Sequence, residues 1–309
     1  MTVMRSRART TMAGLAAAVA LAAGGTAAVA TGAASHVPAR QAAQASSPKQ
    51  VARARAALTR YLSQSNPTVN LTGVAGLKPA TPNLSAGPMG NDLLGSFNWS
   101  GYADSSGTTG EFTAVSATWR EPYTLCTPEQ RLASFWVGLD GLSMSDPTVE
   151  QDGTLAYCFE GHAYYFSWWE MYPAGTVEVG PTVRPGDLIS ASVTRSGTSY
   201  TLALTDYNSP SNSFSTVQTC PAETCLDTSA EWIAERPEYP IGIAPLTYFS
   251  GLSMSRASQT SGGDTGSIAA GPDPTRITMI DATSSYALAV ASGLSRGGTG
   301  FTARWLNSY

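Results

Sequence analysis

Short alternating runs of apolar and polar residues, separated by Gly, Ser, Asn and Pro, dominate the chain after about residue 97. Alternation with a period of two is typical of strands with one buried face, and no stretch of this region keeps a convincing helical period. The pattern predicts an all-β domain, a two-sheet antiparallel sandwich, because two sheets must cover each other's apolar faces. The expected strands lie at 112–119, 134–139, 164–172, 188–193, 200–204, 245–256, 276–281, 286–291 and 301–306.

A glutamate stands in the middle of another such segment, residues 229–237. As a strand, this segment places Glu231, Ile233 and Glu235 on one face and Trp232 on the other. A carboxyl group beside bulky apolar groups has its proton affinity raised by desolvation, which suits acid–base chemistry. An exposed strand glutamate beside a core tryptophan is the simpler interpretation of this stretch taken alone.

The first 34 residues have the pattern of a secretory signal. Arg5, Arg7 and Arg9 precede an apolar run at 12–23, and small residues follow it. No later apolar run is long enough for a membrane span. The sequence therefore predicts a secreted, extracellular protein with no membrane attachment once residues 1–34 are removed.

Charge divides the chain in two. Residues 1–90 hold both lysines and no acidic residue, whereas residues 91–309 hold all 22 acidic residues and no lysine. A basic segment often indicates nucleic acid or a membrane surface. Between a signal and an acidic domain it instead predicts a prosegment, 35–90, bound to the domain 91–309 and released when carboxylates are protonated. A leader without later function is the alternative. Ser47-Pro48 predicts a helix start within it, with residues 49–64 following.

The cysteines favour two disulfides, because their number is even and all lie in the part expected to be exported. Three pairings are open, and nearness in sequence favours Cys126–Cys158 and Cys220–Cys225. A zinc site is the competing interpretation, but His162 is the domain's only histidine. We expect neither a metal nor a cofactor.

The sequence lacks the residues that most hydrolytic mechanisms require. A serine or cysteine nucleophile needs a general base, usually a histidine, and the domain has one histidine. Neither a Gly-x-Ser-x-Gly nor a His-Glu-x-x-His motif occurs. Phosphate-binding glycine loops are also missing, which leaves carboxylate chemistry at low pH. Two of the candidates, Asp140 and Asp187, flank glycines as turn residues do, and Glu170 lies among aromatic residues that suit a core equally well. The candidates are Asp140, Asp152, Glu170, Asp187 and Glu231.

An ordered set of stretches resembles the glutamic peptidases, or eqolisins, over roughly residues 97–285. Weaker agreement continues through 261–263 to 277–281. The matching stretches are Phe135-Trp136-Val137-Gly138-Leu139-Asp140-Gly141, Glu150-Gln151-Asp152-Gly153-Thr154, residues 165–173 and Ala230-Glu231-Trp232-Ile233-Ala234-Glu235.

The resemblance implies a lectin-like sandwich, an endopeptidase active in acid on polypeptide substrates, and a prosegment. It places the catalytic pair at Gln151 and Glu231. We expect Trp136 and Trp232 to wall the cleft and Asp140 to contact substrate, and Glu170 to line the cleft or to orient Gln151. We further expect a monomer with no nucleic-acid partner.

The sequence departs from the fungal members in two places. The loop 140–149 lacks an expected cysteine, for which Cys126 substitutes, and the short Cys220–Cys225 element precedes the catalytic strand. These changes bear on loop geometry and substrate preference.

Two other functions fit a sandwich rich in aromatic residues. A glycoside hydrolase would use Glu170 and Glu231 as its two carboxylates, and a carbohydrate-binding module would use the aromatic side chains alone. Gln151 would have no role in the first, the common Glu-x-Asp-x-Glu pattern is absent, and neither activity explains a prosegment.

Overall fold

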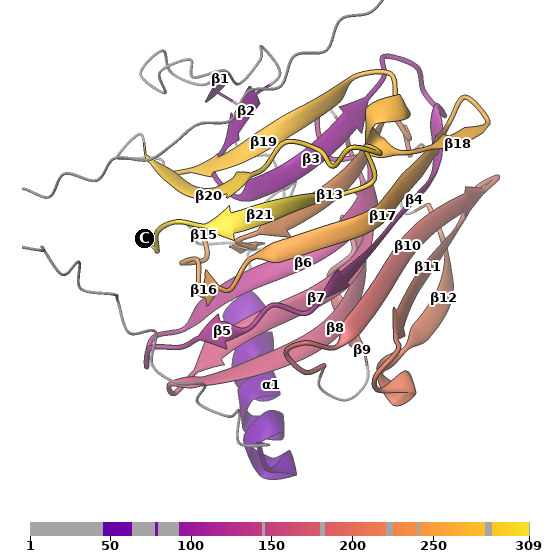
Figure 1. Cartoon of the computed structure of the whole chain (residues 1–309). Helices are drawn as coiled ribbons and strands as arrows, with labels where there is room; N and C mark the ends of the chain where they lie inside the picture. The colour runs from indigo at the N-terminus through magenta and orange to yellow at the C-terminus, as the bar shows by residue number, and fades with distance from the viewer. Residues whose placement is uncertain are drawn as a thin grey trace, which may run out of the picture. The chain divides into compact units, whose positions relative to one another are not determined.

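The computed structural model describes residues 46–63, 78–79, 93–143, 146–179, 183–220, 225–239, 242–281 and 286–308. The expected signal, 1–34, lies outside these ranges, as does most of the expected linker. Apart from one helix, α1 (Pro48–Ser63), and two short 3-10 turns, the elements are strands (Figure 1). They are β1 (Lys78–Pro79), β2 (Leu93–Ser96), β3 (Trp99–Ser105), β4 (Phe112–Arg120), β5 (Thr124–Leu125), β6 (Arg131–Leu139), β7 (Val149–Phe159), β8 (His162–Tyr172), β9 (Val177–Val179), β10 (Leu188–Ser196), β11 (Ser199–Asp206), β12 (Phe214–Thr219), β13 (Ser229–Glu235), β14 (Glu238–Tyr239), β15 (Gly242–Ile243), β16 (Tyr248–Phe249), β17 (Leu252–Ser261), β18 (Asp264–Gly266), β19 (Pro274–Ile280), β20 (Ala287–Ala291) and β21 (Phe301–Trp305).

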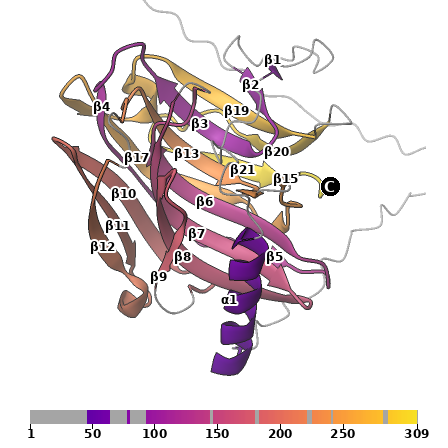
Figure 2. The same cartoon turned by 180° about the vertical axis from the view of Figure 1, so that it is seen from behind.

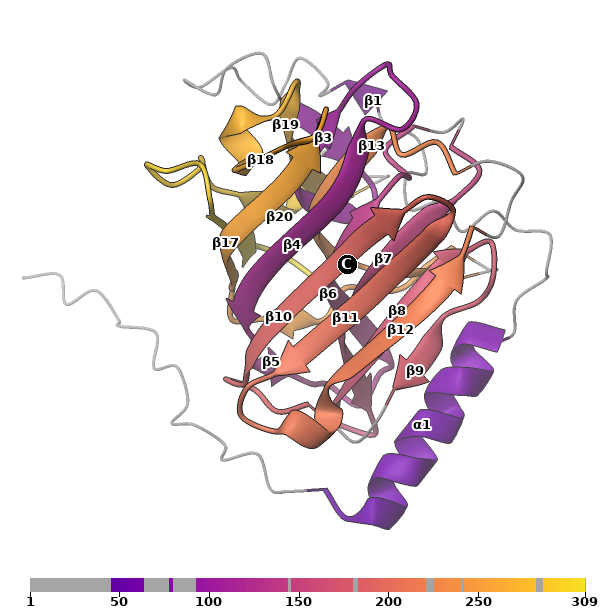
Figure 3. The same cartoon turned by 90° about the vertical axis from the view of Figure 1, so that its right-hand side faces the viewer.

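Most of the strands form one continuous path of antiparallel pairs that folds back on itself, and β14–β15 and β5–β16 form two separate pairs. The path runs β9–β8–β7–β6–β13–β3–β19, continues through β20, β21 and β17 to β4, and ends with β10, β11 and β12. The pairing of β2 with β19 is parallel. Figure 3 shows the layer of β10–β12 in front of the layer of β6–β8. The predicted all-β antiparallel sandwich is confirmed.

The two faces of the layer β6–β8 and β13 have different surroundings because side chains alternate along each strand. One face packs on the other layer and contributes Phe135, Val137 and Trp232 to the main apolar cluster. The opposite face contributes Trp136 and Ile233 to a second apolar cluster. Gln151 and Glu231 are an even number of residues from the members of this cluster on their own strands, so their side chains point to the same second face. We call it the outer face.

Helix α1 packs against the outer face. Ser47 begins the helix as a capping box, because its Oγ accepts from the Gln50 backbone N–H and the Gln50 side chain accepts from the Ser47 backbone N–H. Ala54, Ala57 and Leu58 are buried in the second apolar cluster, at the spacing that puts them on one side of a helix. Figure 2 shows α1 lying across β7 and β8. The predicted helix at 49–64 is thus present, and its apolar side packs in the second apolar cluster.

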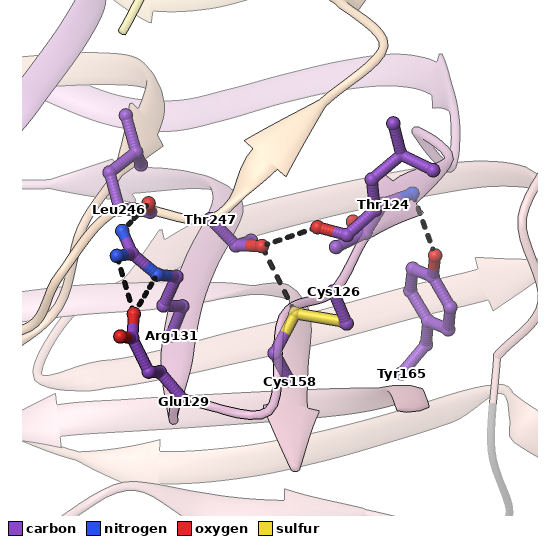
Figure 4. The surroundings of a disulfide bond; sticks show 9 residues. Thr124, Cys126, Glu129, Arg131, Cys158, Tyr165, Leu246 and Thr247 are labelled. Atoms are coloured by element: carbon purple, nitrogen blue, oxygen red, sulfur yellow. Dashed lines mark hydrogen bonds and ion pairs between the residues drawn. A yellow bond between two sulfur atoms is a disulfide. The ribbon is translucent and has the colours of Figure 1, made fainter. Parts of the chain in front are cut away.

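Both predicted disulfides are present. Cys126–Cys158 joins the segment before β6 to the end of β7, and the Thr247 hydroxyl lies 3.1 Å from the Cys158 sulfur (Figure 4). Cys220–Cys225 closes a short connection before β13. Among the described helices, none is long and apolar enough for a membrane crossing.

Candidate active site

Strand register brings the two predicted catalytic residues into one row on the outer face. Glu231 of β13 lies opposite Gly138 of β6, and Gly138 lies opposite Gln151 of β7. Gln151 in turn lies opposite Glu170 of β8. Residues directly opposite each other share a face, so this row presents a carboxyl, a gap, an amide and a second carboxyl in order.

Gly138 is the gap between Glu231 and Gln151. A Cβ atom at this position would lie 3.2 Å from Cβ of Gln151 and 3.0 Å from Cζ3 of Trp136. Because two strand spacings separate β13 from β7, the backbones of Glu231 and Gln151 lie roughly 9.5 Å apart. Because residue 138 is a glycine, no side chain of its own stands between Glu231 and Gln151.

Glu231 is fully buried and neither of its carboxylate oxygens has a hydrogen-bond partner among the described residues. Burial raises its pKa well above the ordinary value for a glutamate, and the nearby Ser229 hydroxyl opposes this shift only in part. The negative charges of Asp140 and Asp146 raise the pKa further. A buried carboxyl group with unused oxygens is the arrangement that acid–base chemistry requires.

The amide of Gln151 is held by Glu170. Gln151 Nε2 donates to Glu170 Oε2 over 2.6 Å, and the Thr176 hydroxyl donates to Glu170 Oε1 over 2.7 Å. The carbonyl oxygen of Gln151 has no partner among the described residues. Burial raises the pKa of Glu170 to about 6, and the hydrogen bonds from Thr176 and Gln151 oppose this shift. Glu170 therefore contacts Gln151 directly, as the sequence led us to expect of an orienting residue.

Trp136 lies beside the pair. It precedes Gly138 by two residues on the same face, and its ring edge borders one side of the gap. Its indole N–H donates to Glu235 over 2.8 Å, and its ring meets Trp99 edge to face at 4.9 Å. Trp99 donates to the same carboxylate over 3.1 Å. Glu235 therefore fixes the ring that borders Glu231 and Gln151.

The expected cleft contact of Trp232 conflicts with its position in the structure. Trp232 is fully buried in the cluster between the two layers, and its indole N–H donates to the Ser116 carbonyl. Successive side chains of a strand point to opposite faces, so the neighbour of Glu231 cannot share its face. Trp232 is a core residue.

Asp140 is buried, and its carboxylate binds the backbone that leads into β13. It accepts from the backbone N–H groups of Asp227 and Thr228 at 2.7 and 2.8 Å. Asp140 has a φ of 64°, in the turn that its neighbour Gly141 predicted. Burial raises its pKa to about 6, and these two hydrogen bonds oppose the shift. The predicted substrate contact of Asp140 remains a prediction. What the structure shows is that Asp140 fixes the backbone just before β13 through two hydrogen bonds.

One acidic group within the described ranges has oxygens close enough together to consider a metal. Oxygens of Asp140, Glu150 and Asp227 lie within 4.8 Å of one another. Asp227, however, already has the hydroxyl of Tyr200 at 2.7 Å and the guanidinium of Arg195 at 3.1 Å. Burial followed by the charge of Asp140 raises the pKa of Glu150 well above its ordinary value. Asp227 is therefore already paired with Tyr200 and Arg195, which disfavours its use as a metal ligand.

Three residues of the candidate site were not predicted from the sequence. Gly138 was visible only as part of a longer apolar run, because its function depends on which strands pair. Thr176 lies beyond a proline-containing turn, and no motif pointed to it. Glu235 could have been found, since the alternation already placed it on the face of Glu231.

Known proteins share both the sequence pattern and the fold. The profile of the peptidase A4 family matches residues 97–302. The structure of scytalido-glutamic peptidase with a transition state analog inhibitor is 25% identical, with a TM-score of 0.57, over 68% of this chain and 98% of that one. SCP-B, a member of the eqolisin family in complex with the tripeptide Ala-Ile-His, is 24% identical, with a TM-score of 0.53 over the same shares. No curated protein matches.

The family profile and the shared sandwich define the class, a peptidase of the glutamic type. The chain belongs to the peptidase A4 family, the eqolisins, as the resemblance of its motifs implied.

Proposed function

We propose that this chain is a secreted endopeptidase that cleaves polypeptides in acid, with Glu231 and Gln151 activating a water molecule. The observation that carries the proposal is their common register with Gly138, which has no side chain to stand between an unpartnered carboxyl and an oriented amide. The family membership supports the reaction class.

In the proposed reaction, Glu231 acts from its ionised form, which its raised pKa makes the less populated form in acid. It takes a proton from a water held between it and the carbonyl oxygen of Gln151. The water oxygen attacks the scissile carbonyl, and the amide N–H of Gln151 that is not bound to Glu170 donates to the developing oxyanion. One such donor contributes about 2.7–4 kcal/mol. Glu231 then gives this proton to the amide nitrogen as the scissile C–N bond breaks, which releases the amine and a carboxylic acid. Burial strengthens Glu231 as a base, and a neutral glutamine places no second charge beside it.

The carbohydrate alternative has less support. A glycoside hydrolase would need Glu170 as a second catalytic carboxyl group. Both oxygens of Glu170 accept hydrogen bonds, from Gln151 and Thr176. The amide of Gln151 separates Glu170 from Glu231 in the row, which suits an orienting role.

The test is hydrolysis of a denatured protein between about pH 2 and 7, a range centred near the titration of a glutamate. The full chain is compared with Glu231→Gln, Gln151→Ala and the matched control Glu129→Gln, which removes an exposed carboxylate paired with Arg131. We expect both site variants to be inactive and folded by circular dichroism, and the control to be active. Undiminished hydrolysis by either folded site variant removes that residue from the mechanism.

A further inference from the structure

A group of acidic side chains lies on the face of the sheet opposite to the proposed catalytic row. Oxygens of Asp140, Glu150 and Asp227 lie within 4.8 Å of one another, and all three residues are buried. Glu150 adjoins Gln151 on β7, so its side chain points to the other face. It lies opposite Leu139, the last residue of β6 before Asp140. We call Asp140, Glu150 and Asp227 the carboxyl cluster.

Two members of the carboxyl cluster have partners and the third does not. Asp227 pairs with the guanidinium of Arg195 at 3.1 Å. Asp140 accepts from the backbone N–H groups of Asp227 and Thr228 at 2.7 and 2.8 Å. Glu150 is fully buried, and neither of its oxygens has a hydrogen-bond partner among the described residues. A buried carboxyl group requires such a partner, so Glu150 must interact within the cluster.

The groups that face the carboxyl cluster add one positive charge and further negative charge. They are Arg195 of β10, Tyr200 of β11, Asp146 of the loop between β6 and β7 and Glu231 of β13. When every carboxyl of the cluster is ionised, three buried negative charges face this one guanidinium. Like charges so close together disfavour each other's ionisation, so the cluster holds at least one proton.

Glu150 is the member of the cluster best suited to hold that proton. Asp140 and Asp227 act as acceptors, for backbone N–H groups and for the Tyr200 hydroxyl, whereas a protonated Glu150 is a donor. Burial raises the pKa of Glu150 well above its ordinary value, and the charge of Asp140 raises it further. Oxygens at most 4.8 Å apart are joined directly or through one water, because an O–H···O contact spans about 2.7–2.8 Å.

We propose that protonated Glu150 is a positioning residue for Glu231, and that loss of this proton sets the upper pH limit of hydrolysis. This inference rests on the proposed function and adds a regulatory group to it. Glu150 donates to Asp140 or Asp227. Asp140 holds the N–H groups of Asp227 and Thr228, and β13 begins one residue later. Once Glu150 ionises, its charge repels Asp140 from those N–H groups, and the start of β13 loses its anchor.

The proposed chemistry supplies no upper pH limit of its own. Glu231 takes a proton from water in its ionised form, and a rising pH populates that form. Hydrolysis confined to acid therefore needs a second group that must keep its proton. Glu150 is such a group: its contact within the cluster is complete below its folded-state pKa and is lost as the pH rises through that value.

The experiment measures kcat and KM between about pH 3 and pH 8, a range that spans ordinary and raised glutamate pKa values. The full chain after acid incubation cleaves one peptide that wild type hydrolyses. Glu150→Gln keeps a neutral donor that cannot ionise, and Glu150→Ala removes it. Glu160→Gln is the matched control, because the side chain of Glu160 is 54% exposed. Hydrogen exchange gives protection factors for the amides of Asp227 and Thr228, and circular dichroism verifies each fold.

In acid, we expect Glu150→Gln to keep the wild-type kcat within about twofold and Glu150→Ala to lose about tenfold, with KM unchanged in both. Where wild type has lost about nine-tenths of its kcat, Glu150→Gln should retain at least about half, a difference of about fivefold. Glu160→Gln should follow wild type throughout. Protection at Asp227 and Thr228 should fall with kcat in wild type and persist in Glu150→Gln.

An upper limit at the same pH in wild type and in folded Glu150→Gln overturns the inference and leaves the proposed function intact. Inactivity of folded Glu150→Gln in acid does the same, because a neutral donor then fails to replace the carboxyl group. No hydrolysis by wild type at any pH overturns both.

Two further results decide the remaining cases. If Glu150→Gln does not fold, protection at Asp227 and Thr228 in wild type supports the inference by falling over the pH range in which kcat falls, and overturns it by persisting. Millimolar calcium is added in a thermal unfolding measurement. A rise in Tm that occurs in wild type and not in Glu150→Gln would show that the cluster binds a cation in place of the proton, which also overturns the inference.

Discussion

The amide nitrogen of Gln151 lies 2.6 Å from the carboxylate of Glu170, and this contact fixes which end of the amide faces which neighbour. The nitrogen points toward β8, so its carbonyl oxygen is left without a protein partner within the described residues. The orientation of Gln151 thus depends on a residue that contributes no atom to the proposed reaction.

Replacing Glu170 should therefore affect turnover more than substrate binding. We expect Glu170→Ala to lower kcat about 10- to 100-fold, because small misplacements of a catalytic group have effects of this size, with KM little changed. Burial raises the pKa of Glu170 to about 6, so the carboxyl is neutral in acid. Glu170→Gln has the shape of that neutral form and should retain most activity. Steady-state kinetics of both variants measure this, and equal damage by both would show that charge, not geometry, is what Glu170 contributes.

Filling the gap at Gly138 should remove activity while the fold persists. The new methyl group of Gly138→Ala would lie 3.2 Å from Cβ of Gln151, so it would displace Gln151 and occupy space assigned to water. We expect kcat to fall by about 10²-fold. Gly107→Ala is the control, since its methyl group would meet no atom within 4 Å. Comparable activity of the two folded variants would argue against a water between Glu231 and Gln151.

Stability should be greater in acid than above neutrality, and Glu121 should be one cause. Burial raises the pKa of Glu121 to about 8, against the opposing hydrogen bonds of Thr154 and Trp119. Since the folded state holds this proton more tightly than the unfolded chain, the stabilisation is complete below about pH 4 and is lost as the pH rises through 8. Its size is on the order of 5 kcal/mol.

Glu121→Gln mimics the protonated side chain and should flatten this decline. Urea unfolding at about pH 4 and pH 8 measures the effect, with Glu129→Gln as the exposed control. The variant should match wild type in acid and exceed it at the higher pH. A variant that declines as steeply as wild type would show that Glu121 is ionised in the folded protein.

The two disulfides should contribute unequally to stability. Cys126–Cys158 spans 32 residues and Cys220–Cys225 spans 5. By loop-closure entropy, the first should contribute about 4 kcal/mol and the second about 2 kcal/mol. Denaturant unfolding of Cys126→Ser/Cys158→Ser and of Cys220→Ser/Cys225→Ser gives the comparison. A larger loss from the second pair would mean that the short loop stabilises β13 by means other than entropy.

Periodicity predicted about half of the strands, and β3, β12 and several short strands were missed, as was the strand that carries Gln151. The predicted segments correspond to strands from β4 to β21, yet β7 was not among them. Its run Glu150-Gln151-Asp152-Gly153 has low strand propensity, although all four residues are buried. Packing on both faces overrides propensity there. Only the ordered set of motifs pointed to this segment.

The sequence supplied the candidate residues of the proposed site and not their geometry. Strand alternation alone places Glu231 and Trp232 on opposite faces. The expectation that Trp232 borders the same cleft as Glu231 did not take this alternation into account. Register cannot be read from a single strand, so neither the position of Gly138 between Glu231 and Gln151 nor the tie between Asp140 and the backbone of Asp227 was visible.

The strand that carries Glu231 is held on both sides. All seven residues of β13 are buried, and β3 and β6 pair with it along its length. Amide hydrogens in such a strand exchange only when the whole domain opens. Glu231 therefore lies in the last part of the domain to open. Denaturant should abolish activity and structure in one step, so the enzyme has no partly unfolded, partly active form to be lost to its own proteolysis.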